Sequence, residues 1–297
     1  MVDGSIVALV TPMTPTGAVD YASLGSLVDC HLQAQTQALV INGSTAEAIT
    51  LSDEERHRIL ATVITRVAKR IPVIAGTGAA STDETIERTQ KALALGADAA
   101  LIVTPYYNRP TQEGLYQHYK AVAEAVPTLP IILYTVPSRT GVDFSIDTLE
   151  RLSLVPTIIG LKDATADLVK QREILARCGK SFTLYSGDDA SALAFIMQGG
   201  RGVISITANV APEAMQHMVK AALLGQVAEA GELNTRLMPL HKAMCFESNP
   251  IPVKWALHKQ GLIQNRVRLP LTTLSTCYHQ PMIEAMQFAG VLPCSVS

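Results

Sequence analysis

The chain has 297 residues, of which 48% are hydrophobic and 17% are charged, so it has enough apolar side chains for a large buried core and is not intrinsically disordered. Its 24 Lys and Arg residues and 26 Asp and Glu residues give a net charge of −2, without any block of like charges. This balance argues against a nucleic-acid-binding surface or a polybasic membrane anchor and favours a small, uncharged or modestly anionic partner.

The cysteines and histidines lack the spacings of a disulfide framework or a metal site. Five cysteines are scattered without a CxxC pair, which favours reduced thiols and a cytoplasmic protein. The seven histidines show neither HxH nor HExxH spacing, so we expect no bound metal. The first residues do not look like a signal peptide, and no apolar window reaches the ~18 residues of a membrane span. The cysteines are Cys30, Cys178, Cys245, Cys277 and Cys294.

Eight short apolar runs without polar alternation predict strands that are buried on both faces. Their starts lie roughly 20 to 35 residues apart, as in repeated βα units. Eight such units predict a closed (β/α)8 TIM barrel, because the glycine fingerprint of an open dinucleotide-binding sheet is missing after the first run. The runs cover residues 6–10, 38–41, 72–75, 99–103, 131–134, 157–161, 182–185 and 202–206.

The segments between the runs have helical spacing. Asp20 is the expected N-cap of a helix at 21–33, and Ser52 with Glu55 predicts a capping box for a helix at 53–70. Thr82 and Gly96 are the expected ends of a helix at 83–95. Further barrel helices are predicted at 113–125, 146–152, 168–177, 190–198 and 212–224. The barrel then occupies residues 1–224, and helices at 226–243, 252–260 and 279–289 form a helical segment over 225–297 that packs on the barrel.

A barrel of this kind has its active site at the C-terminal ends of its strands. Lys162 ends an apolar strand there, where desolvation would lower its pKa and raise the free-amine fraction that Schiff-base chemistry needs. The alternative is a structural lysine paired with a carboxylate at the barrel rim. Tyr134 also ends a strand. It is either a proton donor and acceptor or an aromatic side chain that covers the core.

Two loops on the same face suit a small carboxylate. Ser44 and Thr45 offer hydroxyl and backbone N–H groups after the second strand, although ordinary turn chemistry also favours them there. Arg139 follows the fifth strand, and its planar fork can hold a carboxylate through two hydrogen bonds; a surface ion pair is the alternative.

With these groups on one barrel face, the chain resembles the pyruvate-dependent class I aldolases and, among them, the dihydrodipicolinate synthase family. The resemblance covers nearly the whole chain, and its strength comes from several sequence blocks in the right order. The blocks are GSIVALVTPM at 4–13, PVIAGTG at 72–78, TPYYNRP at 104–110, QEGLYQHY at 112–119, VPSRTG at 136–141, SGDDA at 186–190 and NPIPVK at 249–254.

The resemblance implies an enzyme that condenses pyruvate with aspartate 4-semialdehyde, a step toward diaminopimelate and lysine, without a cofactor. Lys162 would form the imine with pyruvate, and Tyr134 would be the central proton donor and acceptor. Ser44 stands where the family usually has Thr, and with Tyr107 it would complete a proton relay. The family contributes Tyr107 across a subunit contact, which implies a homotetramer or homodimer.

The resemblance also implies a set of substrate-binding residues. Thr45, Gly187 and the backbone at Ile204 would bind substrate, with Thr45 and Ile204 on pyruvate, and Arg139 would hold the carboxylate of aspartate semialdehyde. Arg139 speaks against the first alternative, a lyase for N-acetylneuraminate or a 2-keto-3-deoxy sugar acid. The second alternative is a barrel that binds a small metabolite without turnover.

Four residues depart from the family pattern. Ala46 and Ala166 stand where Gly is common, and a methyl group at position 46 would clash if that position needs a positive φ or a close approach of the backbone to the substrate carboxylate. Thr135 replaces the usual Asn after the catalytic Tyr. Ser44 keeps the hydroxyl of Thr but lacks the β-branch that fixes its rotamer.

The family resemblance also addresses feedback by lysine, which sensitive members bind at the subunit contact. Glu84 and Tyr106 are kept and can meet the amino group and carboxylate of lysine. Ala80 stands at the family's Asn position and Asp53 at its His position, so contacts are lost. We therefore expect weak or absent inhibition by lysine.

Overall fold

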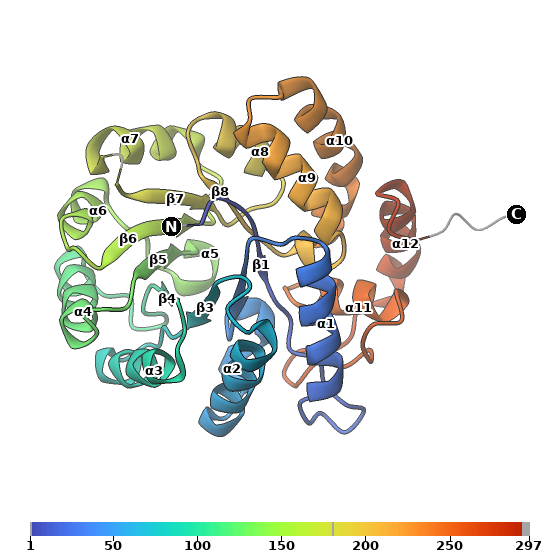
Figure 1. The fold of residues 1–297 in the computed structure, drawn as a ribbon, viewed down its shortest axis with the longest axis horizontal. Coiled ribbons are helices and arrows are strands. Elements are labelled where there is room, and N and C mark those ends of the chain that lie inside the picture. Colours follow the sequence, from blue (N-terminus) through green and yellow to red (C-terminus); the bar gives the residue numbers. More distant parts are fainter. Residues whose placement is uncertain (1, 180, 293–297) are drawn as a thin grey trace, which may run out of the picture.

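Eight parallel strands form a closed barrel in sequence order, which confirms the predicted (β/α)8 fold (Figure 1). This is a computed structural model, and it describes residues 2–179 and 181–292. Each strand pairs with the next along the chain, and β8 closes the ring on β1. The strands are β1 (Gly4–Ala8), β2 (Ala38–Ile41), β3 (Val73–Gly76), β4 (Ala99–Val103), β5 (Ile131–Thr135), β6 (Ile158–Asp163), β7 (Thr183–Ser186) and β8 (Gly202–Ser205).

Helices surround the strands and were predicted to within a few residues. The short helix α5 (Pro137–Thr140) was not predicted, because its four residues are too few for helical periodicity. The other barrel helices are α1 (Tyr21–Gln33), α2 (Asp53–Val67), α3 (Thr82–Leu95), α4 (Gln112–Ala125), α6 (Ile146–Ser153), α7 (Leu168–Cys178), α8 (Ala192–Met197) and α9 (Pro212–Leu223).

Local capping explains where two of these helices begin and end. The Ser52 hydroxyl accepts from the Glu55 N–H and the Glu55 carboxylate accepts from the Ser52 N–H, so the predicted capping box of α2 is confirmed. The helix ends at Val67 rather than at residue 70, because Ala68 adopts the left-handed conformation. The N-cap of α3 is Ser81 and not Thr82, as the Ser81 hydroxyl accepts from a backbone N–H in the first turn.

Two layers of apolar side chains stabilise the barrel. The inner layer fills the barrel and comes from alternate strand residues, among them Ile6, Val40, Ile74 and Ile132. The outer layer lies between strands and helices, as expected for strands buried on both faces. The strand ends are therefore rigid supports for the loops that follow them.

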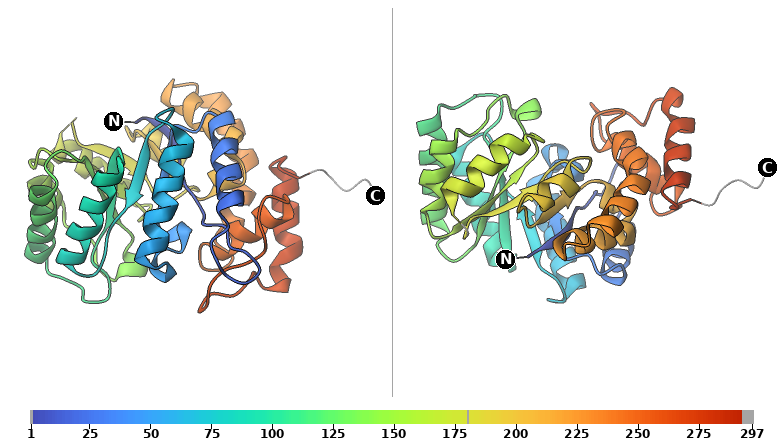
Figure 2. Two further views of the ribbon diagram at one scale, coloured as in Figure 1. Left: turned by 60° about the horizontal axis from the view of Figure 1, so that its bottom comes forward. Right: turned by 90° about the horizontal axis from the view of Figure 1, so that it is seen from above.

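The C-terminal segment forms three helices, α10 (Val227–Ala243), α11 (Ile251–Lys259) and α12 (His279–Phe288). They lie at one side of the barrel, with α12 at its outer edge (Figure 2). Trp255 of α11 is 1% exposed and belongs to the same apolar cluster as barrel residues such as Val7, so burial of shared apolar surface holds the segment on the barrel. The division into units at residues 224 and 225 stays a prediction.

Within residues 2–179 and 181–292, four cysteines are free, namely Cys30, Cys178, Cys245 and Cys277. Cys294 lies outside the described residues. The same part of the chain contains no group of three His, Cys, Asp or Glu side chains that could hold a metal ion. No helix in it is both long and apolar enough to span a membrane.

Candidate active site

Lys162 and Tyr134 lie side by side on neighbouring strands at the C-terminal end of the barrel. Strand register pairs Tyr134 of β5 with Lys162 of β6, and the Lys162 Nζ lies 4.4 Å from the centroid of the Tyr134 ring. Lys162 is 6% exposed and Tyr134 is 8% exposed. Both strands extend beyond the predicted ends, so Lys162 lies within β6 rather than just after it, and Tyr134 lies within β5 as predicted. The amine and the phenol are therefore fixed by the barrel itself.

Burial shifts the acid–base properties of the lysine. Desolvation lowers the pKa of Lys162 to about 8; nearby Arg139 adds to the shift, and the Asp189 carboxylate opposes it. A fall from 10.5 to about 8 raises the free-amine fraction at pH 7 by about 300-fold. Within residues 2–179 and 181–292, Lys162 forms no salt bridge, which argues against the structural alternative of a rim ion pair.

Burial acts on the tyrosine in the opposite direction. Desolvation raises the pKa of Tyr134, and the Arg139 charge and a hydrogen bond with the Ser44 side chain partly offset the shift. The phenol therefore stays protonated at neutral pH and can donate a proton. Its interaction with Ser44 links the β5 end to the turn after β2.

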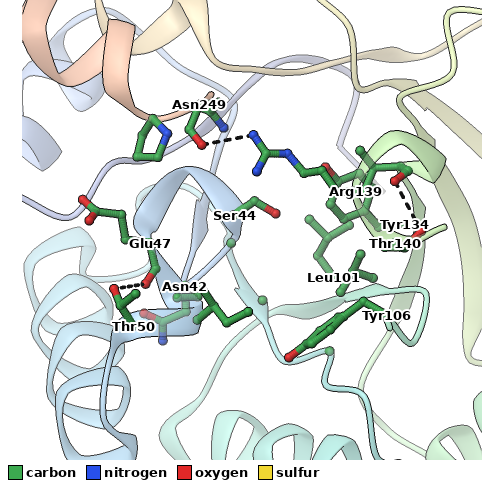
Figure 3. A pocket seen from close by; sticks show the side chains of 18 of the residues that line it. Asn42, Ser44, Glu47, Thr50, Leu101, Tyr106, Tyr134, Arg139, Thr140 and Asn249 are labelled. Carbon is green, nitrogen blue, oxygen red and sulfur yellow. Dashed lines mark hydrogen bonds between the residues drawn. The ribbon is translucent and has the colours of Figure 1, made fainter. Parts of the chain in front are cut away.

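A cavity of about 330 Å³ opens beside these residues (Figure 3). Ser44, Tyr134 and Arg139 line it, and the Ser44 side chain points toward the side where Arg139 and Tyr134 lie. Lys162 does not line this cavity and meets it through the Tyr134 ring. A volume of this size accommodates a small keto acid together with a small aldehyde.

The turn after β2 is a short 3-10 helix, η1 (Ser44–Ala46), that presents its two hydroxyls differently. Ser44 is exposed toward the cavity, whereas Thr45 is 3% exposed and its hydroxyl accepts from the Asn249 side-chain amide at 3.0 Å. Thr45 is thus oriented by a residue more than 200 positions away in the chain.

Asn249 also fixes Arg139. Arg139 lies in α5, and its guanidinium donates to the Asn249 backbone carbonyl at 3.1 Å, as Figure 3 shows. Sequence reasoning missed Asn249 as a site residue, although it stands in the quoted NPIPVK block. The reason is that its role depends on a tertiary contact that no local pattern reveals.

Gly187, which follows β7, lies against the Lys162 side chain, whereas Ile204 lies in β8. A Cβ at position 187 would lie 3.0 Å from the Lys162 Cε and 2.8 Å from the Ala164 Cβ, so only glycine leaves room for the lysine. Ile204 of β8 is fully buried and pairs with Ile6 of β1. Neither residue lines the cavity, so their substrate contacts stay a prediction.

Tyr107 does not reach the site of its own chain. Its side chain is 94% exposed, and it has a φ of 74° in the loop after β4. An aromatic ring this exposed is unusual in a protein that buries its apolar surface elsewhere. The position fits a residue that acts on another subunit, which stays a prediction.

The structure shows the backbone conformation or the contacts of three residues that depart from the family pattern. The left-handed conformation next to Ala46 falls on Glu47, with φ 56°, so position 46 does not need a positive φ. Ala166 does adopt a positive φ, 58°, where glycine would be less strained. Thr135 is buried, and its hydroxyl donates to the Asp143 carboxylate at 2.7 Å.

Comparisons with known proteins agree with this geometry. The model of the dihydrodipicolinate synthetase family matches residues 1–288. The chain is 55% identical over 292 residues to the 4-hydroxy-tetrahydrodipicolinate synthase of Pseudomonas aeruginosa, covering 98% of this chain and 100% of that protein. It is 56% identical over 291 residues to the synthase of the same name from Thioalkalivibrio sulfidiphilus, covering 98% and 99%.

A solved structure is similarly close. The chloride-inhibited dihydrodipicolinate synthase of Acinetobacter baumannii, crystallised in complex with pyruvate, superposes with a TM-score of 0.97 at 51% identity, covering 98% of this chain and 100% of that chain. The chain belongs to the dihydrodipicolinate synthetase family.

Proposed function

We propose that this chain condenses pyruvate with aspartate 4-semialdehyde through a Schiff base on Lys162, giving 4-hydroxy-tetrahydrodipicolinate for diaminopimelate and lysine biosynthesis. The observation that carries the proposal is the buried Lys162 amine, 4.4 Å from the Tyr134 ring, in a chain that matches its synthase relatives over 98% of its length. A desolvated amine is the nucleophile that imine formation with a ketone requires.

The reaction follows from the chemistry of that amine. Lys162 attacks the ketone carbon of pyruvate, and loss of water leaves a protonated imine. The iminium withdraws electrons from the adjacent methyl group, and loss of a methyl proton gives an enamine. The enamine carbon adds to the aldehyde, and the amine of the new chain attacks the imine carbon, closes the ring and releases Lys162. The iminium itself is the electron sink, so the proposal includes no organic cofactor or metal.

Three hydroxyls move the protons. Tyr134 is protonated and hydrogen-bonded to Ser44, which supports its role as the central donor and acceptor. Tyr107 completes the relay from a neighbouring subunit, so the proposal includes a homodimer or homotetramer. The free thiols of the described cysteines are compatible with the cytoplasm, where we place the enzyme.

Substrate binding is assigned to the residues around the cavity. Thr45, Gly187 and the Ile204 backbone would bind substrate beside Lys162, with Thr45 and Ile204 on pyruvate. Arg139 lines the cavity and would hold the semialdehyde carboxylate with its fork. A sugar-acid lyase, whose acceptor carries hydroxyls at that point, has less use for this guanidinium, so the synthase is the better reading.

Trapping with borohydride tests the Schiff base. Pyruvate plus borohydride should leave a reduced adduct on Lys162, located by peptide mass spectrometry. The trapping rate should rise with pH up to about 8, because only the free amine reacts. Lys162→Arg should give no adduct. Lys170→Arg is the matched control, since Lys170 is a nearby lysine paired with Asp143 at 2.6 Å, and it should trap as the unchanged chain does. An adduct on another lysine, or none, contradicts the proposal.

A further inference from the structure

A buried ion pair joins the turn that carries Ser44 and Thr45 to the C-terminal segment. The Lys254 Nζ lies 2.6 Å from the Glu47 Oε1, and both side chains are 1% exposed. Glu47 follows η1 directly, and Lys254 lies in α11. Glu47 lines the cavity and Lys254 does not, and the mechanism above does not use the pair.

Glu47 is the residue that sets the course of the turn. It adopts the left-handed conformation, φ 56° and ψ 32°, which side chains with a Cβ disfavour. It separates η1 from the next 3-10 helix, η2 (Ala48–Thr50). Its side chain leaves the turn on the side opposite to Ser44, as Figure 3 shows. The strained conformation is thus coupled to where the Ser44 hydroxyl points.

The Glu47 carboxylate is held at both oxygens by the C-terminal segment. Oε1 accepts from Lys254, and Oε2 accepts from the Arg268 backbone N–H at 2.8 Å. Two charge-assisted hydrogen bonds in a dry environment fix the carboxylate more firmly than solvent could. The same segment contacts Thr45 through Asn249. The C-terminal segment therefore holds the turn at two residues, Thr45 and Glu47.

We propose that the Glu47–Lys254 pair is a positioning pair that holds the Ser44–Thr45 turn in the geometry that recognises pyruvate. The inference rests on the proposed function for the identity of that substrate. A displaced turn moves the Thr45 hydroxyl and backbone N–H groups away from the pyruvate carboxylate, while Lys162 stays on its own strand. A misplacement of about 1 Å is enough to cost orders of magnitude in productive binding. Loss of the pair should therefore raise the KM for pyruvate far more than it lowers kcat.

Glu47→Gln tests the pair with almost no change in volume. We expect the KM for pyruvate to rise at least 10-fold, kcat at saturating pyruvate to stay within about 3-fold, and the KM for the semialdehyde to stay unchanged. Borohydride trapping on Lys162 should need more pyruvate but reach the same extent. An equal loss in kcat with an unchanged KM for pyruvate would overturn the proposal.

Glu55→Gln is the matched control, because it removes another carboxylate that pairs with the same segment. Glu55 accepts from the Arg268 guanidinium but lies in α2, outside the turn. It should lower the melting temperature without changing the KM for pyruvate. If Glu55→Gln raises that KM as much as Glu47→Gln does at a similar loss of stability, the role of Glu47 is only structural.

The double variant Glu47→Gln with Lys254→Met covers the case in which a single variant fails to fold. It leaves no unpaired buried charge, so its stability should exceed that of either single variant. The raised KM for pyruvate should persist, since the restraint on the turn is still missing. A double variant with the original KM would show that the pair merely neutralises buried charge and would overturn the proposal. An unaltered chain that forms no pyruvate adduct would instead refute the proposed function, and this inference with it.

Discussion

The reactivity assigned to Lys162 and Tyr134 comes from burial, which acts on two groups whose charged forms have opposite sign. Burial destabilises the ammonium of Lys162 and the phenolate of Tyr134, so the lysine tends to lose its proton and the tyrosine keeps its own. A neutral amine beside a neutral phenol is the pair that carbinolamine formation and breakdown need. Two adjacent barrel strands bring these two groups together.

Arg139 should act on the second substrate and not on the first. Arg139→Ala should lower kcat/KM for aspartate semialdehyde by about 30- to 1000-fold, because a charged two-point contact is lost. Pyruvate trapping on Lys162 should persist. The control is Arg172→Ala in α7, where an exposed guanidinium donates to the Gln198 side chain at 3.0 Å, and its kinetics should be unchanged. Equal failure of pyruvate trapping would mean that Arg139 serves the first substrate or the fold.

Two alanines that replace family glycines should respond in opposite ways to reversion. Ala166 has φ 58°, so Ala166→Gly should relieve strain and raise the free energy of unfolding by about 1 kcal/mol. Ala46 is 2% exposed and lies in η1. Ala46→Gly should therefore lower the free energy of unfolding by about 0.5–1 kcal/mol, because a buried methyl group is lost and the unfolded chain gains entropy. Urea unfolding of both variants measures the difference. A stabilised Ala46→Gly variant would contradict this reading of the turn.

At the scale of elements, local chemistry made the helix ends and strand positions predictable. The α2 capping box and the left-handed Gly96 at the end of α3 can be recognised from short residue patterns. Lys162, Tyr134, Ser44 and Arg139 could be found because the fold rule points to strand ends. Asn249 could not, since its contact with Thr45 joins residues 204 positions apart and leaves no periodic signal.

We expect the loop after β3 and the start of α3 to decide the response to lysine. Glu84, which would meet the lysine amino group, already forms an ion pair with Arg88, and Ala80 offers no side-chain hydrogen bond. We expect half-inhibition only at or above about 1 mM lysine, since an unmade hydrogen bond costs roughly 1–3 kcal/mol. A lysine titration of the purified enzyme measures this.

Two variants at one position sharpen that titration. Ala80→Asn should increase sensitivity to lysine, whereas Ala80→Val, of similar size but apolar, should not. If lysine inhibits the unchanged enzyme, the alternative explanation is that neighbouring groups such as His57 compensate for the missing Ala80 contact. Strong inhibition of the unchanged chain at micromolar lysine would contradict the argument from Ala80.

At the scale of the whole molecule, the C-terminal segment is part of the site and not an appendage to it. Through Asn249 it contacts Thr45 and Arg139, and through Lys254 it contacts Glu47. The barrel supplies the reactive groups on its strands, and the segment holds the loops that surround them. One residue of the proposed relay, Tyr107, is still 94% exposed in its own chain.

Removal of a single hydroxyl tests whether Tyr107 acts on a partner. Tyr107→Phe should lower kcat by at least about 10-fold, since a positioned proton donor contributes on the order of 100-fold or more. Stability should not change, because the side chain is 94% exposed in the single chain. Tyr116→Phe in α4 removes the same atom from a half-buried ring under Arg151 and should leave kcat unchanged.

Mixing an inactive Lys162→Ala variant with the impaired Tyr107→Phe variant then decides which subunit supplies the tyrosine. A Lys162→Ala chain keeps Tyr107 and a Tyr107→Phe chain keeps Lys162, so a mixed pair contains one complete site only if Tyr107 crosses the contact. Refolding the two variants together should restore up to about a quarter of the unmutated activity, because half of randomly formed pairs are mixed and each has one complete site of two. Dilution that separates the subunits should abolish the restored activity. A mixture no more active than its components, or a proven monomer with full activity, would place the function of Tyr107 within its own chain.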